Sequence, residues 1–454
     1  MHSGSEHRGE FSSKIGFIFA AAGSAIGLGN IWRFPYVTGQ NGGAAFVVIY
    51  LISILVICLP YMFGELSLGR RTQRNPVGAI RTVRPNSPWV GVGALGVLTG
   101  FFILSYYGVI AGWTLGYIFK NFQGETTNFL EFIADPWAVM PLFFLFILFT
   151  ILVVYGGIQN GIERWSKILM PILFVLMIVL IIRSVTLEGA AKGLEFYLKP
   201  DFSKINGATI LAALGQAFFS LSLGMGAMVT YGSYLSKKDN MVTSGVSVAI
   251  FDTLIALLSG LIIFPALFAV GEKPDAGPSL VFITLPKIFA QMPFGNWIGA
   301  AFFILLSIAA LTSTISLLEV AVSYMVDERR WRRKMAVWVV GGISFLIGVP
   351  SALSQGAVPM FTELPFFGGK SFLDLMDFIW GNVSLALGAL LLSIFIGWVW
   401  GIDNAIEEIN TGNGKFKNKI PALPFTYGQL WGFFMKYFVP VVVALVLINV
   451  FKAF

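Results

Sequence analysis

The sequence predicts an all-α integral membrane protein with about eleven transmembrane helices. Of its 454 residues, 56% are hydrophobic and only 12% are charged, and the mean hydropathy is +0.80. Apolar runs of about 20 residues, long enough to cross a bilayer as a helix, recur along the whole chain. This profile excludes a disordered chain, a nucleic-acid-binding protein and an ordinary soluble domain.

Apolar runs separated by polar breaks define the expected spans. They cover residues 13–36, 44–69, 89–119, 137–156, 162–183, 208–234, 241–270, 297–325, 335–352, 371–399 and 427–451. The external loop 271–296 mixes proline and glycine with apolar residues. We therefore expect it to pack against the bundle as a lid.

Basic residues cluster in four connections that fall on one side of an alternating topology. They are RRTQRNPVGAIRTVR after span two, SKKD after span six, DERRWRRK after span eight, and a loop with Lys415, Lys417 and Lys419 after span ten. The positive-inside rule makes that side cytoplasmic. The N-terminus is therefore expected inside and the C-terminus outside.

The chain offers little for catalysis or thiolate metal binding. Its single cysteine, Cys58, lies in an apolar run, and its two histidines, His2 and His7, lie near the N-terminus. There is no pairing of histidine, cysteine or carboxylate with an activating base. We therefore do not expect an enzyme.

Two of the expected spans are interrupted. Residues 20–35, AAAGSAIGLGNIWRFP, place glycine and polar residues inside the first apolar run, and residues 217–233, AFFSLSLGMGAMVTYGS, do the same in the sixth. Both show a small polar residue followed by Gly-x-Gly. Because five spans separate them, the two halves must insert in opposite orientations. Such paired interruptions point to a transporter's binding site.

We therefore expect an inverted five-helix repeat with broken helices one and six. The expected segments are a cytoplasmic N-terminal segment 1–12, repeats 13–183 and 208–399, and helix eleven in 427–454. Unwound backbone frees carbonyl oxygens for a hard cation and helix N-termini for an anionic group. The alternative is that the glycines only allow close helix packing.

Five ionisable residues lie within or at the ends of the spans, and each costs roughly 2.5–3.5 kcal/mol near a helix centre. They are Arg33, Glu65, Asp252, Glu319 and Asp377. Arg33 is expected to pair with Asp377, Glu65 to accept hydrogen bonds from amides freed in a broken helix, and Asp252 to neighbour a cation. For Glu319, the sequence indicates only a role in packing or hydrogen bonding.

Four motifs, in order along nearly the whole chain, resemble those of the neurotransmitter:sodium symporter family. They are GSAIGLGNIWRFPYVTGQNGGAAF, FFSLSLGMG, ALTSTISLLE and LDLMDF. The resemblance is strongest to the bacterial branch that carries hydrophobic amino acids. It implies sodium-driven alternating access in a bacterial plasma membrane. The family often has twelve spans, whereas eleven are expected here.

The resemblance implies two sodium sites. The first would use Ala25, Asn30, Ser220 and Asp252, and the second would use Gly23, Ile26, Ala309, Thr312 and Ser313. Oxygen-only ligation suits a hard cation. Relatives usually carry Asn at the Asp252 position, and chloride-dependent relatives bind an anion beside it. A fixed carboxylate at Asp252, with Ala256 where relatives carry Ser or Glu, implies chloride independence.

The resemblance also implies an amino-acid site. It would comprise Ser24, Ala25, Gly27, Gly29, Ile103, Tyr107, Phe219, Ser220, Ser222, Met225, Ser313 and Leu317. Monoamine relatives carry Asp where this chain has Gly27, so the space is left for a substrate carboxylate, to which Tyr107 would donate. The adaptable Met225 side chain in a mainly apolar pocket implies a range from leucine, isoleucine and valine to phenylalanine and tryptophan.

Gates follow from the same resemblance. Arg33 and Asp377 would close the outer side, with Phe219 beneath them. The inner side would be closed by Arg8, Phe11, Asp327 and Tyr234, with Ser233 nearby. Gly161 and Pro171 bracket the start of span five, which is a stretch that either unwinds or is a routine helix start. An ion or solute channel, or a transport-inactive amino-acid sensor, is the alternative function.

Overall fold

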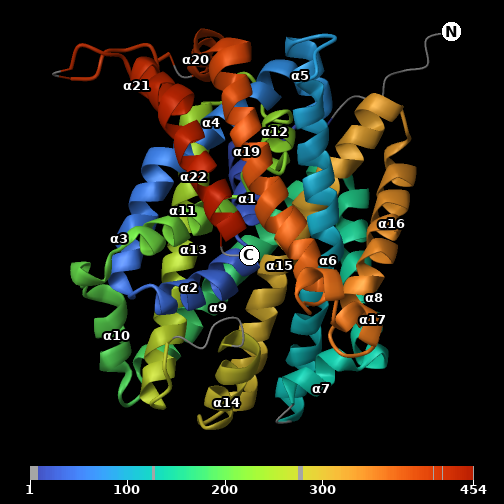
Figure 1. Cartoon of the computed structure of the whole chain (residues 1–454), viewed down its shortest axis with the longest axis vertical. Helices are drawn as coiled ribbons and strands as arrows, with labels where there is room; N and C mark the ends of the chain where they lie inside the picture. The colour runs from blue at the N-terminus through green and yellow to red at the C-terminus, as the bar shows by residue number, and fades with distance from the viewer. Residues whose placement is uncertain (1–8, 125–127, 275–279, 413, 422, 453–454) are drawn as a thin grey trace.

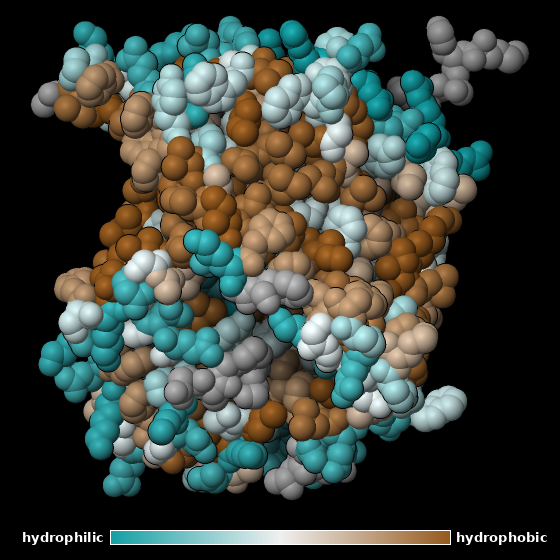
Figure 2. Space-filling view, in the orientation of Figure 1, coloured by the Kyte–Doolittle hydropathy of each residue, from teal (hydrophilic) through white to brown (hydrophobic). Residues whose placement is uncertain are grey.

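The computed structural model describes residues 9–124, 128–274, 280–412, 414–421 and 423–452. These residues form a bundle of long helices (Figure 1), and its middle is covered by apolar side chains (Figure 2). Within the described ranges, nine helices are long and apolar enough to cross a membrane, or ten if the bent first pair counts as one span. The predicted all-helical membrane class is confirmed.

The nine long helices match nine of the expected spans, some of them with short π-helical stretches inside. Five of them are single α-helices: Val90–Gln123 (α6), Pro136–Tyr155 (α8), Met241–Ala269 (α13), Gly295–Arg329 (α15) and Arg333–Leu353 (α16). The other four contain π-helical stretches. They are Ala44–Thr72 (α3, Ala44–Ser53; α4, Leu59–Thr72), Ile158–Val185 (α9, Arg164–Val185), Phe372–Asn410 (α18, Phe372–Met376; α19, Leu385–Ile394; α20, Ile402–Asn410) and Tyr427–Lys452 (α21, Tyr427–Phe433; α22, Val439–Lys452).

The first expected span is broken as predicted. Helix α1, Lys14–Ala25, starts at the Ser13 cap, whose side chain accepts from the Gly16 amide. The chain becomes helical again at Gly29 and continues through α2, Phe34–Gln40. The two parts meet at 53°.

The sixth expected span is two short helices and not one segment over 208–234. Helix α11, Gly207–Ser220, and helix α12, Ala227–Gly232, are joined by residues 221–226, where Ser222, Gly224 and Gly226 have positive φ of 52°, 82° and 76°. This left-handed backbone cannot continue a helix. The break predicted in the sixth span is therefore present, and it divides that span into two helices too short to cross a membrane singly.

Glycines let neighbouring helices pack directly on this break. A Cβ atom on Gly224 would lie 2.7 Å from the Leu385 carbonyl oxygen of α19, and one on Gly388 would lie 2.8 Å from the Gly224 carbonyl oxygen. The freed Gly224 amide donates to Glu65 Oε1 at 3.1 Å. The hydrogen bond expected of Glu65 is confirmed.

Shorter helices cover the two ends of the bundle (Figure 1). Helix α5, Pro76–Val83, lies with α20 and α21 at one end, here named the basic end for its clustered lysines and arginines in 70–84, 329–334 and 415–419. The opposite end carries α7, Phe129–Ala134; α10, Ala190–Leu198; α14, Leu285–Ala290; and α17, Pro359–Thr362.

The expected lid packs on the bundle in its described part. Residues 280–290 are helical, and Phe282 is 1% exposed. The Phe282 ring stacks on Phe129 at 5.1 Å and meets the edges of Tyr117 and Trp32 at 5.4 and 5.9 Å. This part of the loop is therefore held by three other segments; residues 275–279 lie outside the described ranges.

A buried ion pair closes the basic end. Arg70 of α4 and Glu408 of α20 are 0% and 1% exposed, with Arg70 Nε 2.7 Å from Glu408 Oε1. Arg70 also donates to the carbonyl oxygens of Asp239 and Thr411, at 3.0 and 3.1 Å. One guanidinium therefore ties together two spans and the loop between α12 and α13.

We expect Glu408→Gln to lower the free energy of unfolding by about 3–5 kcal/mol, because it leaves the Arg70 charge buried and unpaired. Thermal melting in detergent measures this loss. Glu195→Gln is the matched control, since its partner Lys199 lies 2.9 Å away on an exposed helix surface, where such pairs contribute little. Equal melting temperatures for the two variants would contradict the account.

Candidate functional site

A buried carboxylate lies beside both helix breaks. Asp252 of α13 is 0% exposed. Its Oδ1 accepts from Asn30 Nδ2 at 2.7 Å and its Oδ2 accepts from the Ser220 hydroxyl at 2.8 Å. Within the described part of the chain it forms no ion pair. A buried negative charge with only neutral donors is costly, and a cation bound here would compensate it.

The donor set fits a hard cation such as Na⁺. Asn30, Ser220 and Asp252, three of the four residues predicted for the first sodium site, lie within hydrogen-bond distance of one another. The amide of Asn30 directs its Nδ2 at the carboxylate, so cation binding requires this amide to turn and present its oxygen. Amide and carboxylate oxygens are the ligands that hard cations prefer.

Three polar side chains around this cluster escaped the sequence analysis. Tyr50 donates to the Ser220 hydroxyl at 3.1 Å, Gln216 Nε2 donates to the Gly29 carbonyl at 2.8 Å, and Ser259 donates to the Asn30 carbonyl at 2.7 Å. Gln216 Oε1 is buried without a hydrogen-bond partner. Each of these three is a single polar residue in an apolar span, and such a residue alone is too weak a sequence signal to indicate a site.

The residues predicted for a second cation site also meet. Thr312 Oγ1 lies 3.4 Å from the Ile26 carbonyl oxygen and 3.0 Å from that of Ala309, and Ser313 Oγ lies 3.2 Å from Ile26 O. A Cβ on Gly23 would lie 3.1 Å from Thr312 Cβ. Helix α15 therefore presents two hydroxyls to the carbonyls that the first break leaves free.

A small cavity of about 30 Å³ lies between the two breaks. It is lined by Ser24, Ala25, Gly27, Gly29, Ile103, Tyr107, Phe219, Ser222, Met225, Ser313 and Leu317. These are all but one of the residues predicted for the amino-acid site. The exception, Ser220, points to Asp252 instead.

Hydrogen bonds beside the cavity join the first broken segment to the second and to α6. The Ser222 hydroxyl donates to the Ser24 carbonyl at 2.8 Å, and the Leu28 amide donates to Tyr107 Oη at 2.8 Å. The Tyr107 oxygen accepts in that bond, so its hydroxyl hydrogen is available to a ligand. Met225, Ile103 and Leu317 form the apolar side.

The predicted outer ion pair is not formed. Within the described residues Arg33 makes no salt bridge with Asp377. Its guanidinium instead lies 4.5 Å from the centroid of the Phe219 ring, a cation–π contact. Asp377 accepts from the Tyr106 hydroxyl and from Asn382 Nδ2, both at 3.0 Å. Each charge is therefore already satisfied by another partner.

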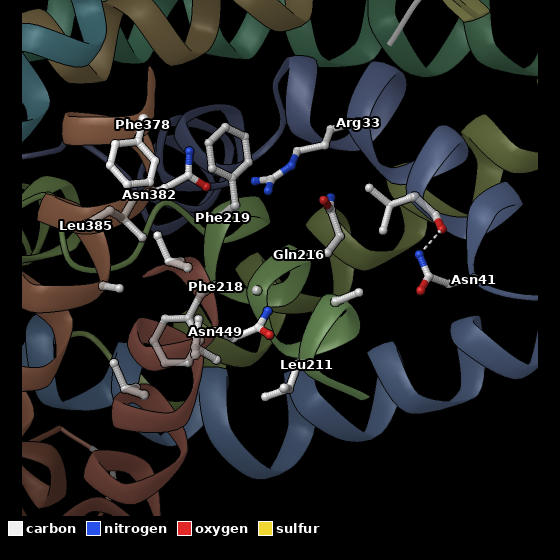
Figure 3. Close-up of a pocket in the computed structure, with 18 of the residues that line it drawn as sticks. Arg33, Asn41, Leu211, Gln216, Phe218, Phe219, Phe378, Asn382, Leu385 and Asn449 are labelled. Carbon is white, nitrogen blue, oxygen red and sulfur yellow. Dashed lines mark hydrogen bonds between the residues drawn. The ribbon is translucent and has the colours of Figure 1, made fainter. Parts of the chain in front are cut away.

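A larger cavity of about 400 Å³ opens on the outer side of Phe219 (Figure 3). Figure 3 shows the Phe219 ring between Arg33 and Asn382, with Gln216 and Asn449 below. The Phe219 side chain borders both this cavity and the smaller one. It is placed to separate them.

At the basic end, the predicted gate residue Phe11 forms a plug among other aromatic rings. Phe11 is 8% exposed and packs edge-on against Phe17, Tyr231 and Tyr234 at 5.5, 5.9 and 6.3 Å. Its amide donates to the Tyr234 carbonyl at 3.2 Å. Arg8, the other predicted N-terminal gate residue, lies outside the described residues.

The remaining inner residues are held by hydrogen bonds. Asp327 accepts from the amide and the side chain of Asn75, at 2.9 and 3.1 Å. The Tyr234 hydroxyl donates to Glu319 Oε1 at 2.6 Å, and Arg333 pairs with Glu319 Oε2 at 2.5 Å. Glu319, for which the sequence indicated no partner, is therefore the buried half of a partly buried ion pair.

Glu163 fastens the N-terminal segment to the start of span five. It is 1% exposed and accepts from the Ser12 amide and hydroxyl, both at 2.7 Å, and from the Ser13 hydroxyl at 2.9 Å. Lys167 lies 2.6 Å away on the next turn. The stretch Ile158–Glu163 is a π-helix after Gly157, whose φ is 79°. The stretch that was expected either to unwind or to be a routine helix start is therefore helical here.

We expect Glu163→Gln to speed amide hydrogen exchange over residues 12–17 about tenfold, because the charged acceptor of three hydrogen bonds is lost. Mass spectrometry of peptic peptides measures this rate. Glu195→Gln, which also breaks an i,i+4 pair with a lysine, should leave the rate unchanged. Equal rates in wild type and Glu163→Gln would show that Glu163 does not hold the segment.

Comparison with known proteins identifies relatives along the whole chain. The model of the "Sodium:neurotransmitter symporter family" matches residues 8–129 and 128–454. The sodium-dependent transporter YhdH of Bacillus subtilis is 40% identical over 449 residues, 97% of each chain. A sodium-dependent transporter of Haemophilus influenzae is 35% identical, over 99% of each chain.

Among solved structures, the crystal structure of MhsT in complex with L-phenylalanine superposes with a TM-score of 0.87. The two chains are 44% identical, and the match covers 98% of this chain and 100% of the other. The chain therefore shares the overall fold of MhsT.

Proposed function

Since the chain belongs to the sodium:neurotransmitter symporter family and is a sodium-dependent membrane transporter, not an enzyme, we propose that its cargo is a hydrophobic L-amino acid. The amino acid, aliphatic or aromatic, moves inward together with two sodium ions by alternating access. The protein lies in the plasma membrane of a bacterium, with its N-terminus in the cytoplasm and its C-terminus outside.

The observation that carries the proposal is the lining of the smaller cavity. It contains backbone groups, hydroxyls and apolar side chains but no charged residue among the described ones. A ligand there must bring its own balanced charges, as a zwitterionic amino acid does. An amine without a carboxylate, or an acidic or basic side chain, is left with a charge that nothing neutralises.

Each part of such a ligand has a matching group. The space beside Gly27 lies against the Tyr107 and Ser313 hydroxyls and suits a carboxylate. The Ser24 carbonyl, which already accepts from Ser222, suits an ammonium. Met225 and its apolar neighbours suit aliphatic and aromatic side chains, and the relative MhsT was crystallised with L-phenylalanine.

The same geometry supports chloride independence. Asp252 supplies a covalently fixed carboxylate beside the proposed first sodium site, and Ala256 on the next turn of α13 has no side-chain donor for an anion. The relatives named "sodium- and chloride-dependent" include the rat GABA transporter 2, which is 27% identical. A chain with a fixed carboxylate here needs no chloride to balance sodium.

Binding of tritiated L-phenylalanine to the purified protein tests the proposal. We expect saturable binding in NaCl and in sodium gluconate, and none in KCl. Unlabelled leucine, isoleucine, valine and tryptophan should displace the label, whereas glutamate, lysine and GABA should not. Absence of sodium-dependent binding in correctly folded protein would overturn the substrate assignment. Binding without later transport would favour the amino-acid sensor, and unsaturable flux would favour a channel.

A further inference from the structure

The connection between α20 and α21 forms a small β-ribbon at the basic end. Lys419 and Thr426 form an antiparallel bridge. The Ile420 amide donates to the Phe425 carbonyl at 3.0 Å, and the Gly428 amide donates to the Phe416 carbonyl at 2.8 Å. We call residues 414–421 and 423–428 the ribbon. Figure 1 shows it reaching sideways beyond the outline of the bundle.

The ribbon exposes basic side chains and buries an aromatic one. At its start the chain turns, with the Asn418 amide donating to the Lys415 carbonyl at 3.0 Å, and Phe416 is buried between the exposed Lys415 and Lys417. Phe416 is 7% exposed and packs against Trp431 at 5.9 Å. The three lysines are exposed, and none of them forms an ion pair within the described part of the chain.

Apolar side chains are also exposed at the tip of the ribbon. Leu423 and Phe425 are each 46% exposed and Tyr427 is 45% exposed. Figure 2 shows brown side chains among the hydrophilic ones at this corner of the molecule. The tendency of basic residues to stay on one side of a membrane accounts for the lysines. It does not account for apolar side chains held out of the protein core.

The ribbon continues an aromatic surface of the last two spans. Trp398, Phe433 and Tyr437 are 56%, 56% and 49% exposed. Lys436 Nζ lies 4.5 Å from the centroid of the Trp398 ring. Exposed aromatic rings with lysines among them mark the level of the lipid headgroups. The ribbon therefore overhangs the membrane at headgroup depth.

We propose that the ribbon binds the headgroups of anionic phospholipids. Its three unpaired lysines contact lipid phosphates, and Leu423, Phe425 and Tyr427 enter the interface between headgroups and acyl chains. Clusters of basic residues beside a transmembrane helix attract anionic lipid within a Debye length. The charge of the ribbon and its exposed apolar tip are both complementary to this occupant. The proposal is independent of the substrate assignment.

A nitroxide spin label on Pro424→Cys, next to the exposed tip, tests it in the full-length protein. The single native cysteine, Cys58, is 0% exposed and does not compete for the label. Protein is placed in nanodiscs of pure phosphatidylcholine or of phosphatidylcholine with phosphatidylglycerol. The ratio of collisions with oxygen to collisions with a water-soluble nickel complex reports the depth of the label.

We expect this ratio to be about threefold higher with phosphatidylglycerol, because the lysines draw the tip into the interface. Replacing Lys415, Lys417 and Lys419 together by Gln should abolish the difference. Replacing Arg330 and Arg332, which lie between α15 and α16, together with Lys334 in the first turn of α16, should not. A label that stays in water in both membranes overturns the proposal and favours a protein partner. Insertion that is equal in both lipids, or unaffected by the triple lysine variant, overturns headgroup recognition.

Discussion

We expect the Gly27→Ala variant to lose affinity for L-phenylalanine by about 100-fold, or about 2.8 kcal/mol. A Cβ atom at this position would lie 2.4 Å from Ser313 Oγ and 2.7 Å from Tyr107 Oη. Both hydroxyls face the space proposed for the substrate carboxylate. The methyl group therefore displaces the donors and fills their site, a steric cost of the size seen for overpacked interiors.

Equilibrium binding of tritiated L-phenylalanine in NaCl measures this loss. Gly342→Ala is the matched control, since a Cβ there has no atom within 4 Å and leaves the cavity intact. Both variants should remain folded, as judged by their melting temperatures. Wild-type affinity in a folded Gly27→Ala protein would show that the carboxylate of the substrate does not bind here.

The second large effect is expected at Asp252. Asp252→Asn keeps the shape of the side chain and removes its charge, so the first sodium ion is left without a nearby carboxylate. In sodium gluconate we expect transport to fall at least about tenfold, since the lost attraction is that of a buried charge pair. Chloride, a mobile anion, should restore part of the activity.

Uptake of labelled amino acid with and without chloride measures the effect. Asp403→Asn, an exposed acidic residue of α20, removes the same charge away from the site and should behave as wild type. Two results would contradict the role of Asp252: an unchanged rate in chloride-free medium, or a loss of rate that appears equally in Asp403→Asn.

The sequence predicts most of the fold because hydrophobic runs of bilayer length can form only helices there. The breaks were found from paired glycine interruptions, and the structure contains both. What sequence periodicity could not reveal is the length of each interruption. Residues 221–226 take a left-handed backbone at three positions, so one apolar run becomes two short helices. The division into two inverted repeats stays a prediction.

The candidate site shows where charge pairing is hard to predict. Glu65 accepts from the Gly224 amide freed by a break, as predicted, because a buried carboxylate needs donors. The cation expected beside Asp252 stays a prediction. Arg33 was expected to find Asp377, yet an aromatic ring and two neutral donors satisfy the two charges separately. Glu319 pairs with Arg333, fourteen residues along the chain. Opposite charges in a membrane must find partners, but only packing decides which ones.

The measurement that tests the central claim most directly is uptake into proteoliposomes. Purified protein in sealed vesicles receives an inward sodium gradient in gluconate medium, with labelled L-phenylalanine, L-tryptophan and L-leucine outside. The account predicts accumulation of all three above their external concentrations, lost when sodium is equal on both sides or replaced by potassium. Folded protein that binds these amino acids but never concentrates them under a sodium gradient would contradict it.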